Sequence, residues 1–344
     1  MHARAQAARI LSVEAAAVRF GGLQGTVRAK PQTSGMSGNV FRVSETASGK
    51  HVCVRLADAW REDAEHGQAD RHHEMVSNTT AVSEAGLGPA VLGFDDATLV
   101  TEWSSGRQLS LDDFNTPEGA ARLGVFFAKL HSIPVSGQPE RMKARVKDLA
   151  AMGDHVGLDT TLLKLVLRLS ILPEPEPLPS LVWTHGDLHL ENVLVGADSS
   201  FSVIDNELAG ARPAAGDLAY FMVTWSMHLG DSYPPYALRH ALAEAYLREM
   251  NNMQQTTSEL LWELEREAPF QAAFCAMAGL MDPSDHMWSE AMKACLHAVA
   301  ESVDVLANVQ WQQRFGLAER ALFQDGVFSV PPLLVHAGRG RSKI

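Results

Sequence analysis

The chain has 344 residues, of which 46% are hydrophobic and 20% are charged, and its formal net charge is −12. This length is enough for a large core and for two lobes, and the composition is that of an ordinary globular protein. The acidic surplus argues against a general nucleic-acid-binding protein, because no excess of Lys and Arg is present to neutralise phosphates. No apolar stretch has the length of a membrane span, and the three cysteines are scattered, so we expect a cytoplasmic protein.

The first 60 residues predict a helix followed by an antiparallel sheet. Residues 1–20 carry three arginines and a single acid, which predicts an amphipathic helix of the domain, with an organelle targeting peptide as the alternative. Alternating residues then predict one strand that ends near Val43 and a second strand at 51–56. Two glycines in the loop 34–39 would let backbone N–H groups approach a phosphate closely, although a plain turn has the same pattern.

Arg55 is a charged residue in the middle of the otherwise apolar strand VCVRLA. A solvated strand face would explain it, and the alternative is that it holds the phosphates of a ligand. Arginine suits this task, because its planar guanidinium binds phosphate through two donors. Glu74, in a helix predicted over 65–85, is the expected partner of Arg55.

Two further short strands are predicted at 90–94 and 98–102, after a glycine-rich turn. The second strand leads through Glu102 and Trp103 into a polar, Gly-containing stretch. An amphipathic helix is predicted next, over 117–131.

Polar side chains flank a hairpin predicted in the middle of the chain, with strands at 193–195 and 201–204. Asp187 and Asn192 precede the first strand and Asp205 follows the second, so we expect the three side chains to meet at one end of the hairpin. Two carboxylates and an amide suit Mg²⁺ rather than zinc. Phosphoryl transfer needs one carboxylate to take the hydroxyl proton, and an Asn and an Asp to hold Mg²⁺. A polar turn beside a core hairpin is the alternative.

The pattern HxDxxxxN from His185, followed by IDxE from Ile204, resembles the aminoglycoside phosphotransferase and choline kinase superfamily. The sequence pattern GLGPxVLGF…TEW…GRxL is similar to the patterns of choline and ethanolamine kinases. The resemblance covers most of residues 33–325. It implies an α+β, two-lobed, protein-kinase-like fold. The N-terminal lobe, 1–103, would be a small antiparallel sheet with a helix, and the C-terminal lobe, 104–344, mainly helical.

The resemblance also implies a role for each matching residue. Asp187 would be the catalytic residue, with His185 orienting its loop and Asp217 bracing it, and Asn192 and Asp205 would hold Mg²⁺. The expected nucleotide-binding residues are Arg55, Glu74, Ser37, Asn39, Glu102 and Trp103. The expected acceptor-site residues are Glu207, Trp225 and Trp288, with Glu207 next to either a second metal or a cationic acceptor.

The expected function is phosphorylation of a hydroxyl on a small, cationic metabolite such as choline or ethanolamine, with ATP as co-substrate and Mg²⁺ as cofactor. Aromatic faces hold a quaternary ammonium best, but the chain has Leu229 and Ala291 where the choline kinases tend to have aromatic residues. An aminoglycoside or another small alcohol is therefore an alternative acceptor. The alternative from another class is a pseudokinase, a binding module without turnover. The expected partners are ATP and the acceptor, and the sequence carries no signal for the oligomeric state.

Overall fold

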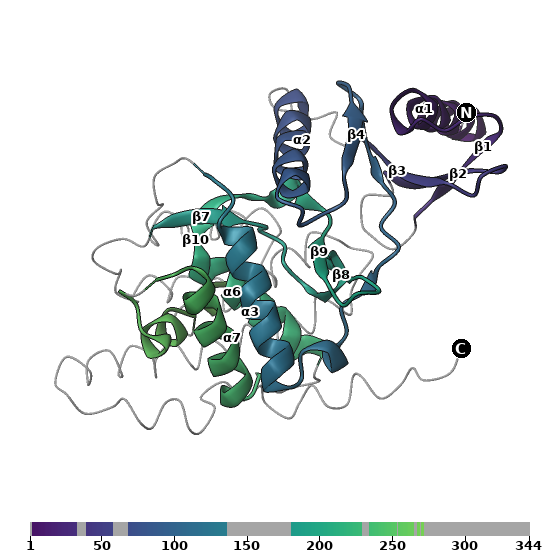
Figure 1. Ribbon diagram of the computed structural model, residues 1–344. Coiled ribbons are helices and arrows are strands. Elements are labelled where there is room, and N and C mark those ends of the chain that lie inside the picture. The colour runs from purple at the N-terminus through teal and green to yellow at the C-terminus, as the bar shows by residue number, and fades with distance from the viewer. Residues whose placement is uncertain are drawn as a thin grey trace. The chain divides into compact units, whose positions relative to one another are not determined.

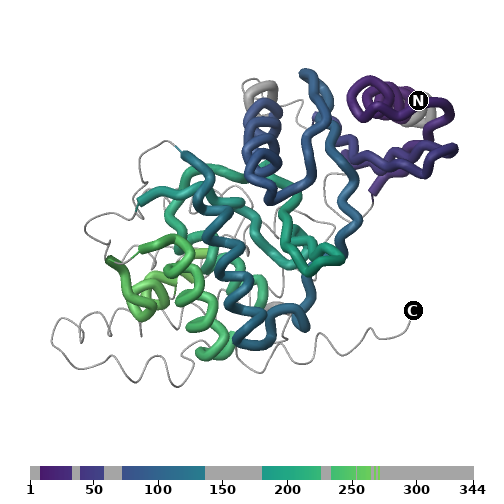
Figure 2. The backbone as a smooth tube through the Cα atoms, in the orientation of Figure 1, coloured from purple at the N-terminus to yellow at the C-terminus, as the bar shows by residue number. Residues whose placement is uncertain are grey.

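The computed structural model describes residues 2–32, 39–57, 68–135, 180–228, 234–252, 254–264, 267–268 and 270–271 (Figure 1; Figure 2 traces the same backbone as a tube). Its contacts divide the chain into two compact units, each described below by itself. The first unit is Met1–Leu109 with Glu191–Ala209, and the second is Ser110–Leu190 with Gly210–Ile344. No helix within the described ranges is long and apolar enough to cross a membrane.

The first unit is built on a five-stranded antiparallel sheet in the order β1-β2-β3-β5-β4. Its strands are β1 (Val27–Pro31), β2 (Val40–Glu45), β3 (His51–Leu56), β4 (Val91–Phe94) and β5 (Thr98–Glu102). Strands β2 and β3 alternate between buried and partly exposed residues, as expected of a sheet with one face in the core. The strands predicted at 51–56 and 98–102 are therefore confirmed.

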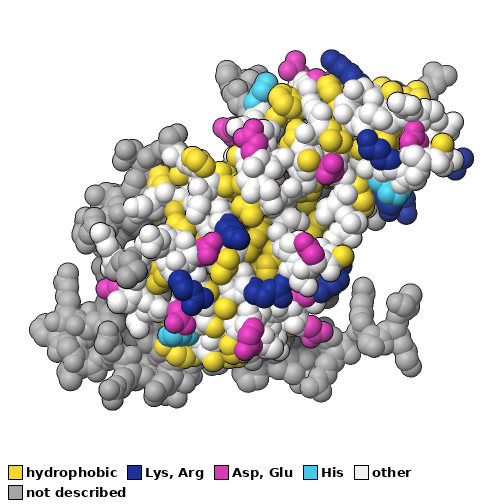
Figure 3. Space-filling model, in the orientation of Figure 1, with side chains coloured by type: hydrophobic (Ala, Val, Ile, Leu, Met, Phe, Trp, Pro, Cys, Tyr) yellow, Lys and Arg dark blue, Asp and Glu magenta, His cyan; other side chains and the backbone are white. Residues whose placement is uncertain are grey.

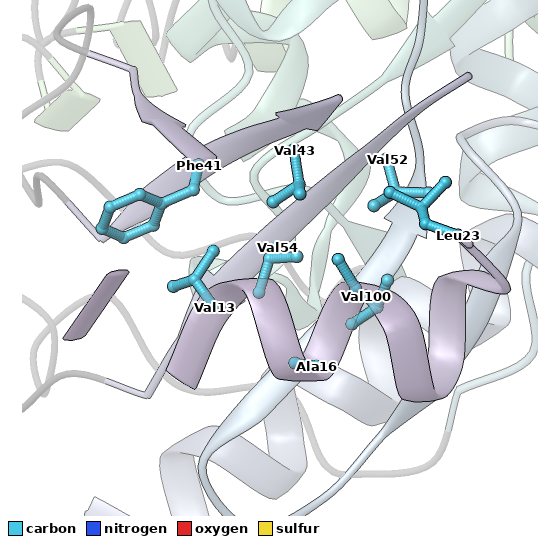
Figure 4. Packing of buried hydrophobic residues seen from close by; sticks show 9 residues of the cluster. Val13, Ala16, Leu23, Phe41, Val43, Val52, Val54 and Val100 are labelled. Carbon is cyan, nitrogen blue, oxygen red and sulfur yellow. The ribbon is translucent and has the colours of Figure 1, made fainter. Parts of the chain in front are cut away.

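Helix α1 (His2–Gly21) covers one face of this sheet. Val13, Ala16 and Ala17 of the helix pack against buried side chains of the strands, among them Val54 and Val100 (Figure 4). The side chains of Val13, Val54 and Val100 are fully buried, so their apolar surface stabilises the docking of the helix. The amphipathic helix expected over 1–20 is confirmed as part of this core.

Helix α2 (Gln68–Glu84) packs on the other face of the sheet. Met75 and Val76 of α2 form a buried cluster with Leu99 of β5. Successive side chains of a strand point to opposite faces, so Leu99 faces away from α1 because Val100 faces towards it. Asn78 of α2 also donates through Nδ2 to the backbone oxygen of Ala209, at 3.0 Å, which ties the helix to the segment that follows the hairpin.

The predicted hairpin consists of β8 (Val193–Val195) and β9 (Phe201–Val203), which pair in antiparallel register. Strand β8 also pairs with β6 (Arg107–Gln108), through Arg107 opposite Val195. This pairing explains why the hairpin belongs to the first unit, whereas we expected it in the lobe 104–344. Short 3₁₀ turns flank it, η3 (Leu190–Asn192) before β8 and η4 (Asn206–Leu208) after β9.

The second unit is mainly helical. Its elements are η1 (Leu111–Asp113), α3 (Pro117–His131), β7 (Leu181–Thr184), β10 (Gly210–Pro213), α6 (Ala214–His228) and α7 (Tyr236–Glu249), and β7 pairs with β10 in an antiparallel ribbon. Helix α3 begins after Thr116, whose side chain accepts from the backbone N–H of Gly119, and it starts with Pro117. The helix predicted over 117–131 is confirmed, and the described chain is α+β.

Candidate functional site

In the first unit, the guanidinium of Arg55 is held by two carboxylates of the segment that follows the hairpin. Nη1 of Arg55 donates to Oδ1 of Asp205 at 2.6 Å, and Nη2 donates to Oε2 of Glu207. The side chain of Arg55 is 12% exposed, so the cation is mostly withdrawn from water, while the two carboxylates are 37% and 40% exposed. A charged strand residue is thus stabilised by two acids that lie 150 and 152 positions further along the chain.

The backbone around Asp205 has a conformation that few residues adopt. Its φ is 67° and its ψ is 56°, in the left-handed region, which Asp and Asn tolerate better than other non-glycine residues. Such conformations cluster at functional sites. Just before Asp205, the backbone N–H of Ile204 donates to the backbone oxygen of Asn192 at 3.0 Å. The backbone of Asn192 therefore lies next to the residue that precedes Asp205.

These residues fit a magnesium ion by the chemistry of their donors. Asp205 and Glu207 already share one cation, the guanidinium of Arg55, and Asn192, in the turn just before β8, is buried. All three offer oxygen ligands, which Mg²⁺ prefers. Within the described residues no group of three or more His, Cys, Asp or Glu side chains forms a metal site. A magnesium ion is usually bound by one or two carboxylates together with substrate phosphates, so this arrangement is compatible with it.

The expected pair of Arg55 and Glu74 is not among the ion pairs of the described residues. Glu74 lies in α2 with an exposed side chain, and the described residues contain no ion pair between it and Arg55. In this structure the carboxylates recorded on Arg55 are instead those of Asp205 and Glu207. That Arg55 and Glu74 form a pair when nucleotide binds stays a prediction.

The free energy of unfolding of the nucleotide-free chain should reveal these pairings. In a double-mutant cycle, Arg55→Ala and Glu207→Ala are expected to be non-additive by about 0.5–1 kcal/mol, because both remove one partly exposed ion pair. The cycle with Glu74→Ala in place of Glu207→Ala is the matched control and should be additive within about 0.5 kcal/mol. Urea denaturation of the six chains measures both terms. Coupling to Glu74 without coupling to Glu207 would contradict the pairing described here.

The other predicted nucleotide-binding residues lie around the same sheet. Asn39 is buried, and its backbone oxygen accepts from the N–H of Leu56, at 3.0 Å, next to Arg55 on β3. Glu102 ends β5 with an exposed side chain, and its backbone N–H donates to Ala90. Trp103 is half-buried, with the guanidinium of Arg42 4.9 Å from the centre of its ring. Ser37 lies outside the described residues.

In the second unit, the loop after β7 is fixed by Asp217 of α6. Oδ2 of Asp217 accepts from the backbone N–H of His185 at 2.9 Å, and Oδ1 accepts from that of Gly186 at 3.0 Å. His185 is completely buried, and its Nδ1 accepts from the backbone N–H of Asp187 at 3.3 Å. These hydrogen bonds tie His185 to the loop and to Asp217, which favours an orienting role.

Asp217 also belongs to a buried network that sequence reasoning missed. Nε2 of His131 lies 3.3 Å from Oδ2 of Asp217, and Nδ1 of His131 lies 3.0 Å from the hydroxyl of Tyr246. Three helices therefore meet in one set of hydrogen bonds. Burial alone would raise the pKa of the Asp217 carboxyl, but the hydrogen bond and charge of His131, with the charge and backbone N–H of His185, outweigh it and lower this pKa.

Replacing Asp217 by asparagine should lower the free energy of unfolding at pH 7 by about 1.5–3 kcal/mol, because a buried charged acceptor of two N–H groups is lost. A carboxyl whose pKa is lower in the folded chain contributes stability above its unfolded pKa, about 3.9, and that contribution is lost as the pH falls towards the folded value. The stability gap between wild type and variant should therefore narrow below about pH 4. Denaturation at several pH values measures this gap, with exposed Asp112→Asn as control. A gap that is absent at pH 7, or that widens in acid, would contradict the network.

Asp187 is the residue of this loop whose carboxylate is open to solvent, since its side chain is 30% exposed. The hydroxyl of Tyr220 donates to Oδ1 at 2.6 Å, and Nε2 of His189 lies 3.5 Å from Oδ2. Burial works against ionisation, but the hydrogen bond and charge of His189, the hydrogen bond of Tyr220 and the charge of His185 lower the pKa of Asp187 to about 2. The carboxylate is therefore ionised at neutral pH.

Tyr220 and His189 are contacts of Asp187 that the sequence interpretation did not include. His189 lies two residues after Asp187, and Tyr220 lies three residues after Asp217 in a segment predicted as helical. Residues three apart on a helix lie on one face. Because Asp217 was expected to brace the loop, Tyr220 could have been identified as a candidate for contact with the side chains of the same loop.

Trp225, expected at the acceptor site, lies in the core of the second unit. Its side chain is 0% exposed and packs edge-on against Phe114, with ring centres 4.3 Å apart, and against Phe221, at 6.0 Å. Helix α6 is apolar on several sides, and most of its aromatic residues are buried in the core. In this structure Trp225 therefore packs the core and is closed to an acceptor arriving from solvent. Trp288 lies outside the described residues.

The predicted site residues fall into both units. Arg55, Asn192, Asp205 and Glu207 belong to the first unit, and His185 and Asp187 to the second. Contacts join Arg55 to the two acids in one unit, and His185 to Asp187 in the other. That Asp187, Asn192 and Asp205 all meet at one place stays a prediction.

Comparison with known proteins gives a family and a fold. The sequence model of the phosphotransferase enzyme family matches residues 28–255, more than half of the chain. Choline kinase B1 of Caenorhabditis elegans is 26% identical in a 224-residue alignment that covers 58% of this chain and 58% of that protein, so the chain spans less than two thirds of this relative's length.

Solved structures of small-molecule kinases share the fold. The choline kinase of Cryptosporidium parvum superposes with a TM-score of 0.65 at 14% identity, over 86% of this chain and 93% of that one. The ethanolamine kinase of Plasmodium vivax gives a TM-score of 0.62 at 14% identity, over 80% and 83% of the two chains. The expected α+β, protein-kinase-like fold is confirmed, as is the resemblance to choline and ethanolamine kinases.

Proposed function

Because this chain belongs to the phosphotransferase enzyme family, we propose that it transfers the γ-phosphoryl group of ATP to a hydroxyl of a small, cationic metabolite such as choline or ethanolamine. The observation that carries the proposal is the position of Asp187. Its carboxylate is partly open to solvent, accepts from the hydroxyl of Tyr220 and is fixed at the end of a braced loop. A group of this kind is what an acceptor hydroxyl needs beside it.

In the proposed reaction Asp187 orients the acceptor hydroxyl and takes its proton as the bond from oxygen to phosphorus forms and the bond to ADP breaks. A carboxylate with a pKa of about 2 is a weak base in the ground state. Most of the acceleration is therefore expected from placement of the reactants and from neutralisation of charge rather than from strong base catalysis. His185 keeps the loop in place and does not transfer protons.

Asn192 and Asp205 are the proposed ligands of Mg²⁺. When bound, the ion would neutralise charge that builds on the nucleotide phosphates. Arg55, which is shared between Asp205 and Glu207 in this structure, would contact the phosphates when nucleotide arrives. The glycine loop with Ser37 and Asn39 would cover the phosphates, and the backbone at Glu102 and Trp103 would bind the adenine.

The net charge of −12 gives a weak long-range attraction for a cationic acceptor. On the face shown in Figure 3, acidic and basic side chains are interspersed, so over the residues described there the acidic surplus is distributed rather than gathered in one patch. Glu207 is the proposed local contact for the cation or for a second metal. Because Trp225 is buried, it does not offer an aromatic face to a quaternary ammonium group. Ethanolamine, which can be held by charge, is therefore as good a candidate acceptor as choline.

A panel of acceptors with γ-labelled ATP and Mg²⁺ tests this function. Choline, ethanolamine, an aminoglycoside and a neutral sugar alcohol separate the acceptor classes by which product carries the label. We expect label on an amino alcohol, with little on the neutral alcohol. Label only on the aminoglycoside would replace the acceptor and keep the reaction. Stabilisation by nucleotide without label on any acceptor would identify a pseudokinase and overturn the proposal.

A further inference from the structure

The carboxylate of Asp187 is contacted on each of its two oxygens by a different side chain of the second unit. The hydroxyl of Tyr220 donates to Oδ1 at 2.6 Å, a short, charge-assisted hydrogen bond. Nε2 of His189 lies 3.5 Å from Oδ2, a longer and weaker contact. Of these two contacts, the one from Tyr220 to Oδ1 is the shorter.

Two residues in one turn of helix α6 support the loop, one through its backbone and the other through the side chain of Asp187. Asp217 and Tyr220 are three residues apart and so lie on the same face of the helix. Asp217 accepts the backbone N–H groups of His185 and Gly186, which fixes the chain just before Asp187. Tyr220 then holds the carboxylate of Asp187 itself. Backbone and side chain are positioned by the same rigid element.

We propose that Tyr220 is a positioning residue for Asp187: its hydroxyl fixes the rotation of the carboxylate that receives the proton of the acceptor hydroxyl. This inference rests on the proposed function. A carboxylate with a fixed rotation stays in position for its target, and misplacement of a reacting group by about 1 Å can cost a hundredfold in rate. Tyr220 touches neither ATP nor the transferred phosphoryl group in this account, so it acts through Asp187 alone.

Tyr220→Phe removes the hydroxyl and leaves the ring. We expect kcat to fall about tenfold, the lower end of the loss expected for a hydrogen bond to a charged group, and KM for ATP to be unchanged. The pKa of Asp187, followed by ¹³C NMR of its carboxyl group, should rise from about 2, because one of the donors that lower it is gone. 3-Fluorotyrosine at position 220 keeps the hydroxyl and should restore kcat.

Tyr236→Phe is the matched control, since it removes a tyrosine hydroxyl from an exposed position on α7 of the same unit. It should leave kcat and the pKa of Asp187 as in the wild type. If the wild-type chain turns over and Tyr220→Phe has the same kcat, the positioning role of Tyr220 is overturned while the proposed function stands. A fall in kcat that is matched by a higher KM for ATP and a lower melting temperature would assign Tyr220 to the core and overturn it as well. A wild-type chain without turnover on any acceptor would overturn the proposed function, and this inference with it.

Discussion

Asp187→Ala is expected to lower kcat by about 10²–10⁴-fold, the usual contribution of a positioned group that transfers a proton. The affinity for ATP should be largely unchanged, because Asp187 faces the acceptor in the proposed reaction. Steady-state kinetics with saturating ATP, together with a nucleotide-binding titration, separates the two effects. This is the largest effect on the chemical step that the proposed site predicts.

Asp112→Ala is the control for this variant, because it removes an exposed carboxylate from the same unit. It should keep wild-type kinetics. Near-normal turnover of Asp187→Ala would show that the phosphoryl acceptor lies elsewhere. A loss of ATP binding as large as the loss of kcat would give Asp187 a role at the nucleotide instead.

Asp205→Asn is expected to abolish most of the Mg²⁺-dependent affinity for ATP. The substitution keeps the size of the side chain but removes the negative charge of a ligand to a hard cation. The loss should be at least the roughly 10- to 100-fold observed when an outer partner of a metal site is removed. Calorimetric titration of ATP at several Mg²⁺ concentrations measures it.

Asp198→Asn is the matched control, because Asp198 is an exposed residue of the turn between β8 and β9. Asp205 also holds Arg55, so the melting temperature of each variant must be recorded beside its affinity. An unchanged Mg²⁺ dependence in a folded Asp205→Asn chain would exclude Asp205 as a ligand of the ion.

The sequence predicted local structure well where its signals are local. Strands at 51–56 and 98–102 and the helix over 117–131 are found with the predicted bounds. Alternation of apolar residues marks the strands, and Thr116 and Pro117 mark the start of the helix. The helix predicted over 65–85 is observed as α2 (Gln68–Glu84) within the described residues.

Long-range partners could not be predicted in the same way. The choice of Glu74 for Arg55 rested on a likeness to protein kinases, whereas the carboxylates recorded on Arg55 here come from Asp205 and Glu207. Nothing in the residues around Arg55 distinguishes one distant acid from another. Only the antiparallel packing of the sheet and the path of the chain after the hairpin decide which acids approach it.

Burial of aromatic residues was equally hard to predict. The spacing of Trp225 matches a family position, but a helix that is apolar on several sides does not reveal which residues face the core. Tyr220, whose hydroxyl donates to Asp187, was not among the predicted site residues. A tyrosine in an apolar helix needs a partner for its hydroxyl, and the sequence alone does not show where that partner lies.

Direct observation of the transferred phosphoryl group tests the central claim. The wild-type chain is incubated with ATP, Mg²⁺ and ethanolamine or choline, and the reaction is followed by ³¹P NMR. The account predicts that a phosphate monoester resonance and ADP appear in equal amounts, that both need Mg²⁺, and that both form at least about 100-fold more slowly with Asp187→Ala. ATP that binds but yields no monoester with any acceptor of the panel would contradict it.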